Sequence, residues 1–319
     1  MSEQKLEDEQ HSLISVIVIT YNSSEFVLET LESVRNQTYR NIELIISDDG
    51  SSDDTLNKCN VWVDQNKERF VRVQVLSVKS NTGIPANSNR AIRACRGEWI
   101  KGIAGDDLLL PECVAANMDY VTSSQEEMSI LFSNMQSFHM EKGNRVVNVI
   151  NNDVRSQNIS GLSSQEQFEA LLASNFISAP TGFCKRKLLS QYPYNELYRF
   201  AEDYPQWLKL TYNGVKLYFM DRLTVMYRCD NLSATRSFRY YYLPRMHESR
   251  VLFFWNEEIK YLGKGHEAIY NRERQEIFLY DLVDIFLSNK KSKWHSFIYR
   301  IMKWTVSHFC NFKLESSIK

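Results

Sequence analysis

The first third of the chain alternates apolar runs with segments whose apolar residues recur at three- and four-residue steps. β-Branched runs are typical of buried strands, and a 3.6-residue period is typical of helices. The predicted strands are Ser15–Thr20, Asn41–Ser47, Val71–Val78 and Trp99–Ile103. The predicted helices are Glu25–Gln37, residues 55–70 and Ala86–Cys95, with caps expected from Ser23 or Ser24 and from Asp53 or Asp54. This alternation predicts an α/β fold whose parallel sheet is covered on both faces.

Beyond Pro111 the pattern is less regular. Helices are predicted over Glu112–Ser123, Gln165–Ala173 and, within Arg199–Asn213, from Glu202 onward with Pro205 in the first turn. Strands are predicted over Ile130–Phe138, Val146–Ile150, Lys216–Met220 and Thr224–Tyr227. The polar segment Asn151–Ser164 is expected to be a surface loop, and the chain from about Arg239 is expected to be helical.

Composition narrows the class of protein. The 319 residues carry a net charge of −1, so no bulk attraction for nucleic acid is expected. The six cysteines show no close pairing or ligand spacing, which argues against a disulfide framework or a zinc site and favours a reducing compartment. The start of the chain lacks the pattern of a signal peptide, and no apolar run reaches the roughly 18 residues of a membrane span. A cytoplasmic protein is therefore expected.

Two pairs of adjacent aspartates each follow an apolar run. They are Asp48-Asp49 and Asp106-Asp107. Adjacent carboxylates repel each other, so a fold tolerates them best beside a cation or hydrogen-bond donors. Open α/β sheets bind ligands at strand ends, and Mg²⁺ and Mn²⁺ prefer carboxylate oxygens. The pattern predicts a metal-assisted nucleotide or phosphate site, with an Asx turn at the first pair and a helix cap at the second as the structural alternatives.

Two further segments have candidate roles. Thr20-Tyr21-Asn22 ends the first predicted strand, where backbone N–H groups can hold a base or phosphate or can simply form a strand-to-helix turn. Glu202-Asp203 opens a predicted helix. A carboxylate there is a candidate general base, and complementing the helix dipole is the alternative.

The order and spacing of these segments resemble those of family 2 glycosyltransferases of the bacterial surface-polysaccharide type, which build O-antigen and capsule. The resemblance is carried by SVIVITYN at 15–22, QTYRNIELIISDDGSSD at 37–53, NTG at 81–83, GEWI at 97–100 and GDD at 105–107 before Pro111. It is specific over residues 13–112 and recognisable as far as Asp203 and Tyr227-Arg228.

The resemblance implies a GT-A fold with a Rossmann-like half and a mostly parallel central sheet. It divides the chain into a polar tail (1–12), a nucleotide-sugar-binding half (13–112), an acceptor-binding half (113–236) and a helical C-terminal region (237–319). The implied reaction is an inverting transfer from a nucleotide-diphosphate sugar, with UDP-sugar favoured, assisted by Mg²⁺ or Mn²⁺. The implied acceptor is a saccharide, plausibly linked to polyprenyl diphosphate.

Residue roles follow from the same resemblance. Thr20, Tyr21 and Asn22 would line the base site, Asp49 would contact the base or ribose, and Asp48 would support the turn. Asn81 and Gly83 would complete the nucleotide-binding set. Asp107 would bind the metal directly, Asp106 would serve both metal and nucleotide, and Asp203 would be the base with Glu202 beside it.

Three positions depart from the family pattern. Ala104 replaces the first acid of the metal element, Ser88 replaces an arginine, and Asp230 replaces a histidine. Asp230 is retained as a weaker candidate for the metal or the diphosphate. A non-catalytic nucleotide-sugar-binding protein remains an alternative. A sugar nucleotidyltransferase is disfavoured because no Gly-rich basic loop follows the first strand.

The C-terminal segment combines basic residues with an aromatic stripe. Lys290, Lys291, Lys293, Arg300, Lys303 and Lys313 accompany aromatic and apolar residues at three- and four-residue steps from Trp294 to Phe312. This pattern is expected of a helix lying on an anionic membrane surface, on the cytoplasmic face where a lipid-linked acceptor would be found. A packed terminal helix or a dimer helix is the alternative, and the sequence leaves the oligomeric state open.

Overall fold

The structure is a computed structural model that describes residues 12–142, 144–151, 153–229 and 241–312. The chain divides into two compact units. The first comprises Met1–Glu196 with Glu202–Asp230, and the second comprises Leu197–Ala201 with Asn231–Lys319.

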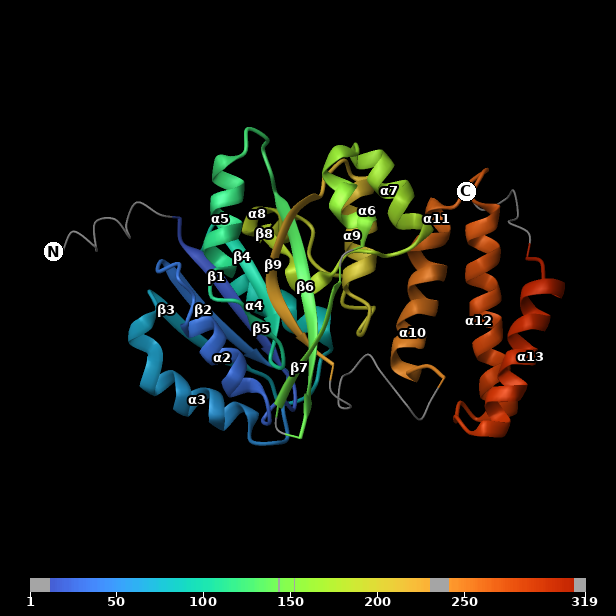
Figure 1. The fold of residues 1–319 in the computed structure, drawn as a ribbon, viewed down its shortest axis with the longest axis horizontal. Helices are drawn as coiled ribbons and strands as arrows, with labels where there is room; N and C mark the ends of the chain where they lie inside the picture. Colours follow the sequence, from blue (N-terminus) through green and yellow to red (C-terminus); the bar gives the residue numbers. More distant parts are fainter. Residues whose placement is uncertain (1–11, 143, 152, 230–240, 313–319) are drawn as a thin grey trace. The chain divides into compact units, whose positions relative to one another are not determined.

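The first unit is built on a parallel sheet (Figure 1). Its parallel strands are β3 (Arg72–Ser77), β2 (Ile42–Asp48), β1 (Ile14–Thr20) and β4 (Trp99–Ala104), side by side in that order. Nearly every residue of β1 and β2 is buried because helices cover both faces. Helices α2 (Val27–Arg35) and α3 (Thr55–Asn66) lie over one face, and α4 (Ile84–Ala94) lies over the other. The predicted parallel sheet is confirmed.

The remaining strands continue the sheet in a mixed arrangement. Beyond β4 the order is β8 (Phe183–Lys185), β6 (Ile130–Glu141), β9 (Tyr218–Arg228) and β5 (Leu108–Leu109), with β7 (Asn144–Asn151) paired to β6. The pairs β4–β8, β8–β6, β9–β5 and β6–β7 are antiparallel, whereas β6–β9 is parallel. This pairing fuses the second half to the first and brings the end of β9 beside the residues that follow β4.

The helices of this half and of the C-terminal unit largely match the predictions. The first unit adds η1 (Lys67–Arg69), α5 (Cys113–Ser123), α7 (Ser164–Ala173), η3 (Ala179–Thr181), α8 (Arg186–Gln191) and α9 (Asp203–Tyr212). The described part of the second unit is helical, as expected, and contains α10 (Pro244–Phe253), η4 (Phe254–Glu258), α11 (Ile259–Tyr261), α12 (Glu267–Leu287) and α13 (Lys293–Phe309).

Some local predictions were wrong. The segment predicted as a loop over Asn151–Ser164 contains α6 (Val154–Asn158) and η2 (Ile159–Gly161), because Ile159 is buried and the Asp153 carboxylate caps α6 through the N–H of Arg155. The two strands predicted between 216 and 227 form one strand, β9, with irregular register against β6. Both errors arose because tertiary contacts decided conformations that local polarity left ambiguous.

The predicted serine cap of the first helix is also absent. Helix α2 begins at Val27, and neither the Ser23 nor the Ser24 hydroxyl caps it. The Asp53 carboxylate instead accepts hydrogen bonds from the N–H groups of Thr55 and Ser24, at 3.0 and 3.1 Å, and so joins the starts of two helices.

A buried carboxylate ties three strands together beneath the helices. The side chain of Glu43 in β2 accepts hydrogen bonds from Ser15 Oγ at 2.6 Å, Arg72 Nη1 at 2.8 Å, the N–H of Gly97 at 3.0 Å and the N–H of Arg96. Burial raises the pKa of Glu43, but these hydrogen bonds outweigh burial and the pKa is lowered overall. The ionised form is therefore part of the folded structure.

We expect Glu43→Ala to lower the free energy of unfolding by about 3–5 kcal/mol, since it removes the carboxylate partner of the half-buried Arg72 and the acceptor of the buried Gly97 N–H. Urea unfolding measures the change. Glu127→Ala is the matched control, because Glu127 is exposed and its surface pair with Lys185 should contribute less than about 1 kcal/mol. The difference in the free energy of unfolding between wild type and Glu43→Ala should become smaller as pH falls through the lowered pKa of Glu43, because the protonated side chain loses these interactions. Equal effects of the two substitutions would contradict the assignment.

Candidate active site

The carboxyl ends of β1, β2 and β4 meet at one edge of the sheet. Thr20 lies opposite Asp48 in register, and Ile19 lies opposite Ala104. The N–H of Asp49 donates to the Thr20 carbonyl at 2.9 Å, and the N–H of Gly105 donates to the Ile19 carbonyl at 2.9 Å. The two aspartate pairs found in the sequence therefore follow neighbouring strands at the same edge.

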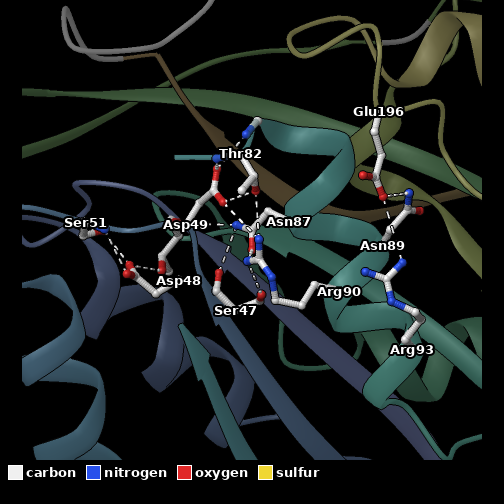
Figure 2. Close-up of polar contacts among 12 residues, drawn as sticks. Ser47, Asp48, Asp49, Ser51, Thr82, Asn87, Asn89, Arg90, Arg93 and Glu196 are labelled. Atoms are coloured by element: carbon white, nitrogen blue, oxygen red, sulfur yellow. Dashed lines mark hydrogen bonds and ion pairs between the residues drawn. The ribbon is translucent and has the colours of Figure 1, made fainter. Parts of the chain in front are cut away.

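Asp48 holds the turn that follows β2. Its carboxylate accepts hydrogen bonds from the Ser51 N–H at 2.9 Å, the Ser51 hydroxyl at 2.5 Å and the Thr20 hydroxyl at 3.0 Å (Figure 2). All of these partners belong to the protein, and the side chain is buried. Asp48 thus fixes the turn against β1.

Asp49 joins this turn to the segment before α4. Its carboxylate accepts from the N–H groups of Thr82 and Gly83 at 2.9 and 2.8 Å, from the Thr82 hydroxyl, and from Arg90 Nη2 at 3.3 Å (Figure 2). Asn81 is half-buried at the start of the same segment. Asp49, which is predicted to contact the base or ribose, accepts hydrogen bonds from these protein donors in the structure.

Gly50 permits this close approach. Its φ is +75°, and a Cβ there would lie 2.9 Å from the backbone of Ser80. Only glycine meets both conditions without strain. The turn after β2 and the segment before α4 therefore pack backbone to backbone.

Arg90 is a site residue to which the sequence analysis gave no role. Its guanidinium contacts Asp49 and also donates to Thr82 Oγ1 and Asn87 Oδ1, both at 2.8 Å. The family has an arginine where this chain has Ser88, and Arg90 stands two positions further along the same helix. Arg90 provides a cation at this edge of the sheet.

The segment after β1 is also held by side chains. The N–H groups of Asn22 and Ser23 donate to the hydroxyls of Ser51 and Thr55, each at 2.8 Å, and Asn22 Oδ1 accepts from the Ser52 N–H at 2.9 Å. Asn22 adopts a left-handed conformation with φ of +50°. Tyr21, in contrast, is 46% exposed. The segment thus presents the Tyr21 ring to solvent, while its N–H donors are committed within the protein.

The second aspartate pair is fixed by the end of β9. Asp107 is buried, and its Oδ1 accepts from the N–H of Arg228 at 2.8 Å. The Asp106 carbonyl accepts from Arg228 Nε at 2.8 Å. Burial, followed by the neighbouring charge of Asp106, raises the pKa of Asp107 well above its usual range, although Arg228 and Lys101 oppose the shift. The buried environment therefore favours neutralising the charge of Asp107, which either a proton or a bound cation can do.

Arg228 is itself buried and held from three directions. Its guanidinium pairs with Glu29 of α2, and it lies 4.3 Å from the ring centre of Phe26 and 4.6 Å from that of Phe138. Glu29 also pairs with Arg145 of β7. The resemblance pointed to Arg228 by position but assigned it no role. In the structure it positions Asp106 and Asp107.

The donor set fits a divalent cation that is completed by substrate and water. Within the described ranges, no three His, Cys, Asp or Glu side chains are grouped as a metal site. Mg²⁺ commonly takes only one or two carboxylates and completes its shell with phosphate and water oxygens, and Asp106 and Asp107 match that requirement. Ala104 adds no ligand, and Asp230 lies outside the described residues.

Glu202 and Asp203 lie at the start of α9, as predicted, and form a second acidic environment. Asp203 Oδ2 accepts from Asn175 Nδ2 at 3.3 Å. Burial raises the pKa of Asp203, and burial together with the charge of Asp203 raises the pKa of Glu202 to about 7. A carboxylate that holds its proton more tightly than usual is suited to proton transfer near neutral pH.

Helix α4 links this acidic pair to the sheet edge. Burial raises the pKa of Tyr194, and the charges of Glu202 and Asp203 add to the shift. The backbone of Tyr194 exchanges hydrogen bonds with the Asn89 side chain, at 2.9 and 3.1 Å. Asn89 stands one residue before Arg90, which contacts Asp49. One helix therefore connects the surroundings of Asp49 to those of Asp203.

A second connection runs beneath the sheet edge. The positive charge of the buried Lys101 of β4 acts to lower the pKa of Asp107. Lys101 Nζ also donates a hydrogen bond to the Pro180 carbonyl at 2.5 Å. Asn175, which contacts Asp203, lies five residues before Pro180 in the segment between α7 and η3. The metal candidates and the base candidate thus belong to one connected part of the first unit.

Comparison with known proteins places this geometry in a family. The family model described as "Glycosyl transferase family 2" matches residues 15–192. An uncharacterized glycosyltransferase of Methanocaldococcus jannaschii is 24% identical over 272 residues, which cover 85% of this chain and 87% of that protein. The Escherichia coli UDP-Glc:alpha-D-GlcNAc-diphosphoundecaprenol beta-1,3-glucosyltransferase WfaP is 25% identical over 220 residues, which cover 68% and 77%.

A solved structure supports the fold. The crystal structure of S. aureus TarS 1-349 in complex with UDP-GlcNAc matches with a TM-score of 0.56 at 19% identity, covering 86% of this chain and 73% of that chain. Together with the mostly parallel sheet of the first unit, this likeness identifies the GT-A fold. Since the family model spans more than half of the 319 residues, the chain belongs to glycosyl transferase family 2.

Proposed function

We propose that the chain transfers a sugar, with inversion, from a UDP-sugar to a hydroxyl of a saccharide acceptor. The observation that carries the proposal is the presence of two acidic pairs in different environments within one unit. Asp106-Asp107 is held by Arg228, and burial together with the repulsion between the two carboxylates raises the pKa of Asp107 despite Arg228 and Lys101, whereas the pKa values of Glu202 and Asp203 are raised mainly by burial. When two acidic pairs have different environments, one can serve in charge stabilisation and the other in proton transfer.

Asp203 is the proposed base. Inversion is a single in-line displacement in which the acceptor oxygen bonds to the anomeric carbon as the bond from that carbon to the diphosphate oxygen breaks. The acceptor hydroxyl proton passes to the Asp203 carboxylate. Asn175 orients that carboxylate by its hydrogen bond, and such a base contributes about 10²–10⁴-fold to the rate. An α-linked donor gives a β-linked product.

Asp106 and Asp107 are the proposed holders of Mg²⁺ or Mn²⁺. A bound cation would supply positive charge to the leaving nucleoside diphosphate. The protein's own contribution is to keep the two carboxylates in place through Arg228, and to provide Arg90 at the neighbouring edge. Thr20, Tyr21, Asn22, Asp48, Asp49, Asn81 and Gly83 remain the proposed nucleotide-binding set, with Tyr21 the side chain that is open to a base.

The acceptor proposed is an oligosaccharide on polyprenyl diphosphate, used in O-antigen or capsule synthesis at the cytoplasmic face of the membrane. The activity of WfaP, which joins glucose from UDP-Glc to a sugar on diphosphoundecaprenol, supports this acceptor. The UDP-GlcNAc complex of TarS supports a UDP-sugar as the donor. Residues 13–112 are proposed to bind the donor and residues 113–236 the acceptor.

A panel of UDP-sugars with Mn²⁺ and lipid-diphosphate saccharides tests the proposal through UDP release. Release that requires both donor and acceptor is expected. Tight UDP binding without turnover by any pair would instead support the non-catalytic alternative. The N–H groups of Asn22 and Ser23 after β1 already donate to side chains of the protein. This argues against a loop that binds a triphosphate, and thus against a nucleotidyltransferase.

We expect Asp203→Asn to lower kcat by about 10²–10⁴-fold, because the acceptor hydroxyl loses its base. UDP affinity, measured by calorimetry, should stay within about threefold of wild type, since the change is confined to proton transfer. Asp119→Asn, on the exposed face of α5, is the control and should leave both quantities unchanged. A loss of UDP affinity as large as the loss of kcat would contradict the role of Asp203.

The pH profile should report the coupled acidic pair. Because Glu202 lies beside the proposed base, its protonation changes the charge next to Asp203, and kcat/KM should fall as pH decreases below about 7, where Glu202 takes up a proton. The Glu202→Gln variant should lose this inflection and decline only at lower pH, through the raised pKa of Asp203. An unchanged inflection in Glu202→Gln would show that another group titrates.

Arg228→Gln should raise the Mn²⁺ concentration needed for half-maximal activity by about 10–100-fold, the usual cost of removing a group that orients metal ligands. Arg145→Gln is the matched control, because Arg145 pairs with the same Glu29 but is exposed and is not bonded to Asp106 or Asp107. Circular dichroism and UDP binding verify that both variants are folded. Equal metal requirements in the two variants would refute the positioning role.

A further inference from the structure

Helix α13 carries apolar side chains on two opposite faces. Its inner face packs within the second unit, where Tyr299 stacks on Tyr241 at 4.4 Å between ring centres and Val306 is 3% exposed. The end of α13 is tied to α12, since Gln275 Nε2 donates to the Cys310 carbonyl at 2.6 Å. These contacts account for one apolar face only.

The outer face is an exposed stripe of large apolar residues. Trp294, Phe297, Ile301 and Trp304 follow one another at steps of three, four and three residues, so they share one side of the helix. Their exposed fractions are 68%, 50%, 49% and 55%. Such a stripe is not needed to anchor α13 to α12, and large exposed apolar patches mark interaction surfaces.

The charged residues of α13 itself are all basic. Helix α13 contains no Asp or Glu, while Lys293, Arg300 and Lys303 lie within it and Lys290 and Lys291 precede it. Arg300 is exposed and stands three residues after Phe297 and four before Trp304, so it borders the stripe. The surface is therefore apolar along its centre and basic at its edge.

We propose that the outer face of α13 binds the surface of a bilayer that contains anionic lipids. Trp is favoured at the boundary between headgroups and acyl chains, and basic side chains are attracted to anionic headgroups. Among the helices in the described ranges, none is long and apolar enough to cross a bilayer. A helix of 17 residues, about 25 Å long, lies along the surface.

A second copy of the chain fits this face less well. Two-fold pairing would bring the same surface together from both copies. The basic residues of one α13 would then meet those of the other without an acidic residue on either helix to compensate. Anionic headgroups provide the missing negative charge. The outer face is therefore assigned to a lipid surface and not to a second copy of the chain.

This inference rests on the proposed function in one respect, since a lipid-linked acceptor would lie in the bilayer to which α13 binds.

The test is sedimentation of the full-length chain with phosphatidylcholine vesicles containing increasing fractions of phosphatidylglycerol. Binding should rise with the anionic fraction and fall with added salt. Phe297→Ser with Trp304→Ser should lower the vesicle partition coefficient at least about tenfold, since two large apolar contacts are lost.

The control is Val61→Ser with Val71→Ser, which removes two exposed apolar residues of the first unit and should leave binding unchanged. Arg300→Glu with Lys303→Glu should abolish the preference for anionic vesicles. Binding that is insensitive to the anionic fraction or to both double variants would overturn the proposal. So would a wild-type dimer that becomes monomeric in Phe297→Ser/Trp304→Ser and never binds vesicles.

Failure of this inference is distinguishable from failure of the proposed function. UDP release with a short-chain, water-soluble acceptor reports transfer without a bilayer. Transfer without vesicle binding would refute only the lipid-binding role of α13. Vesicle binding without transfer to any acceptor would refute only the proposed reaction.

Discussion

The buried guanidinium of Arg228 is the interaction on which the rest of the site depends. It lies where the end of β9 meets the turn after β4, and its main chain and side chain bond to Asp107 and Asp106. A buried arginine requires a partner, and Glu29 of α2 supplies the carboxylate while the rings of Phe26 and Phe138 pack against the guanidinium. The first and second halves of the GT-A unit are thus joined through one charge network.

This network explains how two adjacent carboxylates are tolerated in a buried position. Arg228 and Lys101 offset part of the repulsion, but the pKa of Asp107 remains raised because burial and Asp106 outweigh them. Under the proposed function, a cation bound with the nucleotide diphosphate would supply the positive charge that this pair lacks in the free protein.

Helix α4 provides the second constraint. Asn87 and Arg90 face the sheet edge, where they bond to the carbonyl and the hydroxyl of Ser47 and to Asp49, while Asn89 bonds to Tyr194 near Glu202 and Asp203. These side chains leave one short helix in different directions. The distance between the sheet edge at Asp49 and the base candidate Asp203 is therefore set by α4, which is a rigid element. Each acid keeps its own environment for this reason.

The sequence alone determined the strand–helix alternation, the family and the positions of the acidic pairs. Those features rest on local periodicity and on short motifs, which a linear pattern contains. It did not determine that Asp49 would accept hydrogen bonds from Thr82 and Gly83, that Arg90 would stand beside it, or that Arg228 would hold Asp106 and Asp107. These contacts join residues 33 to 122 positions apart, and only the packing of strands and helices decides which side chains meet. The same reason explains α6 and the outer stripe of α13: local pattern shows that a residue is polar or apolar, whereas burial depends on what the fold places against it.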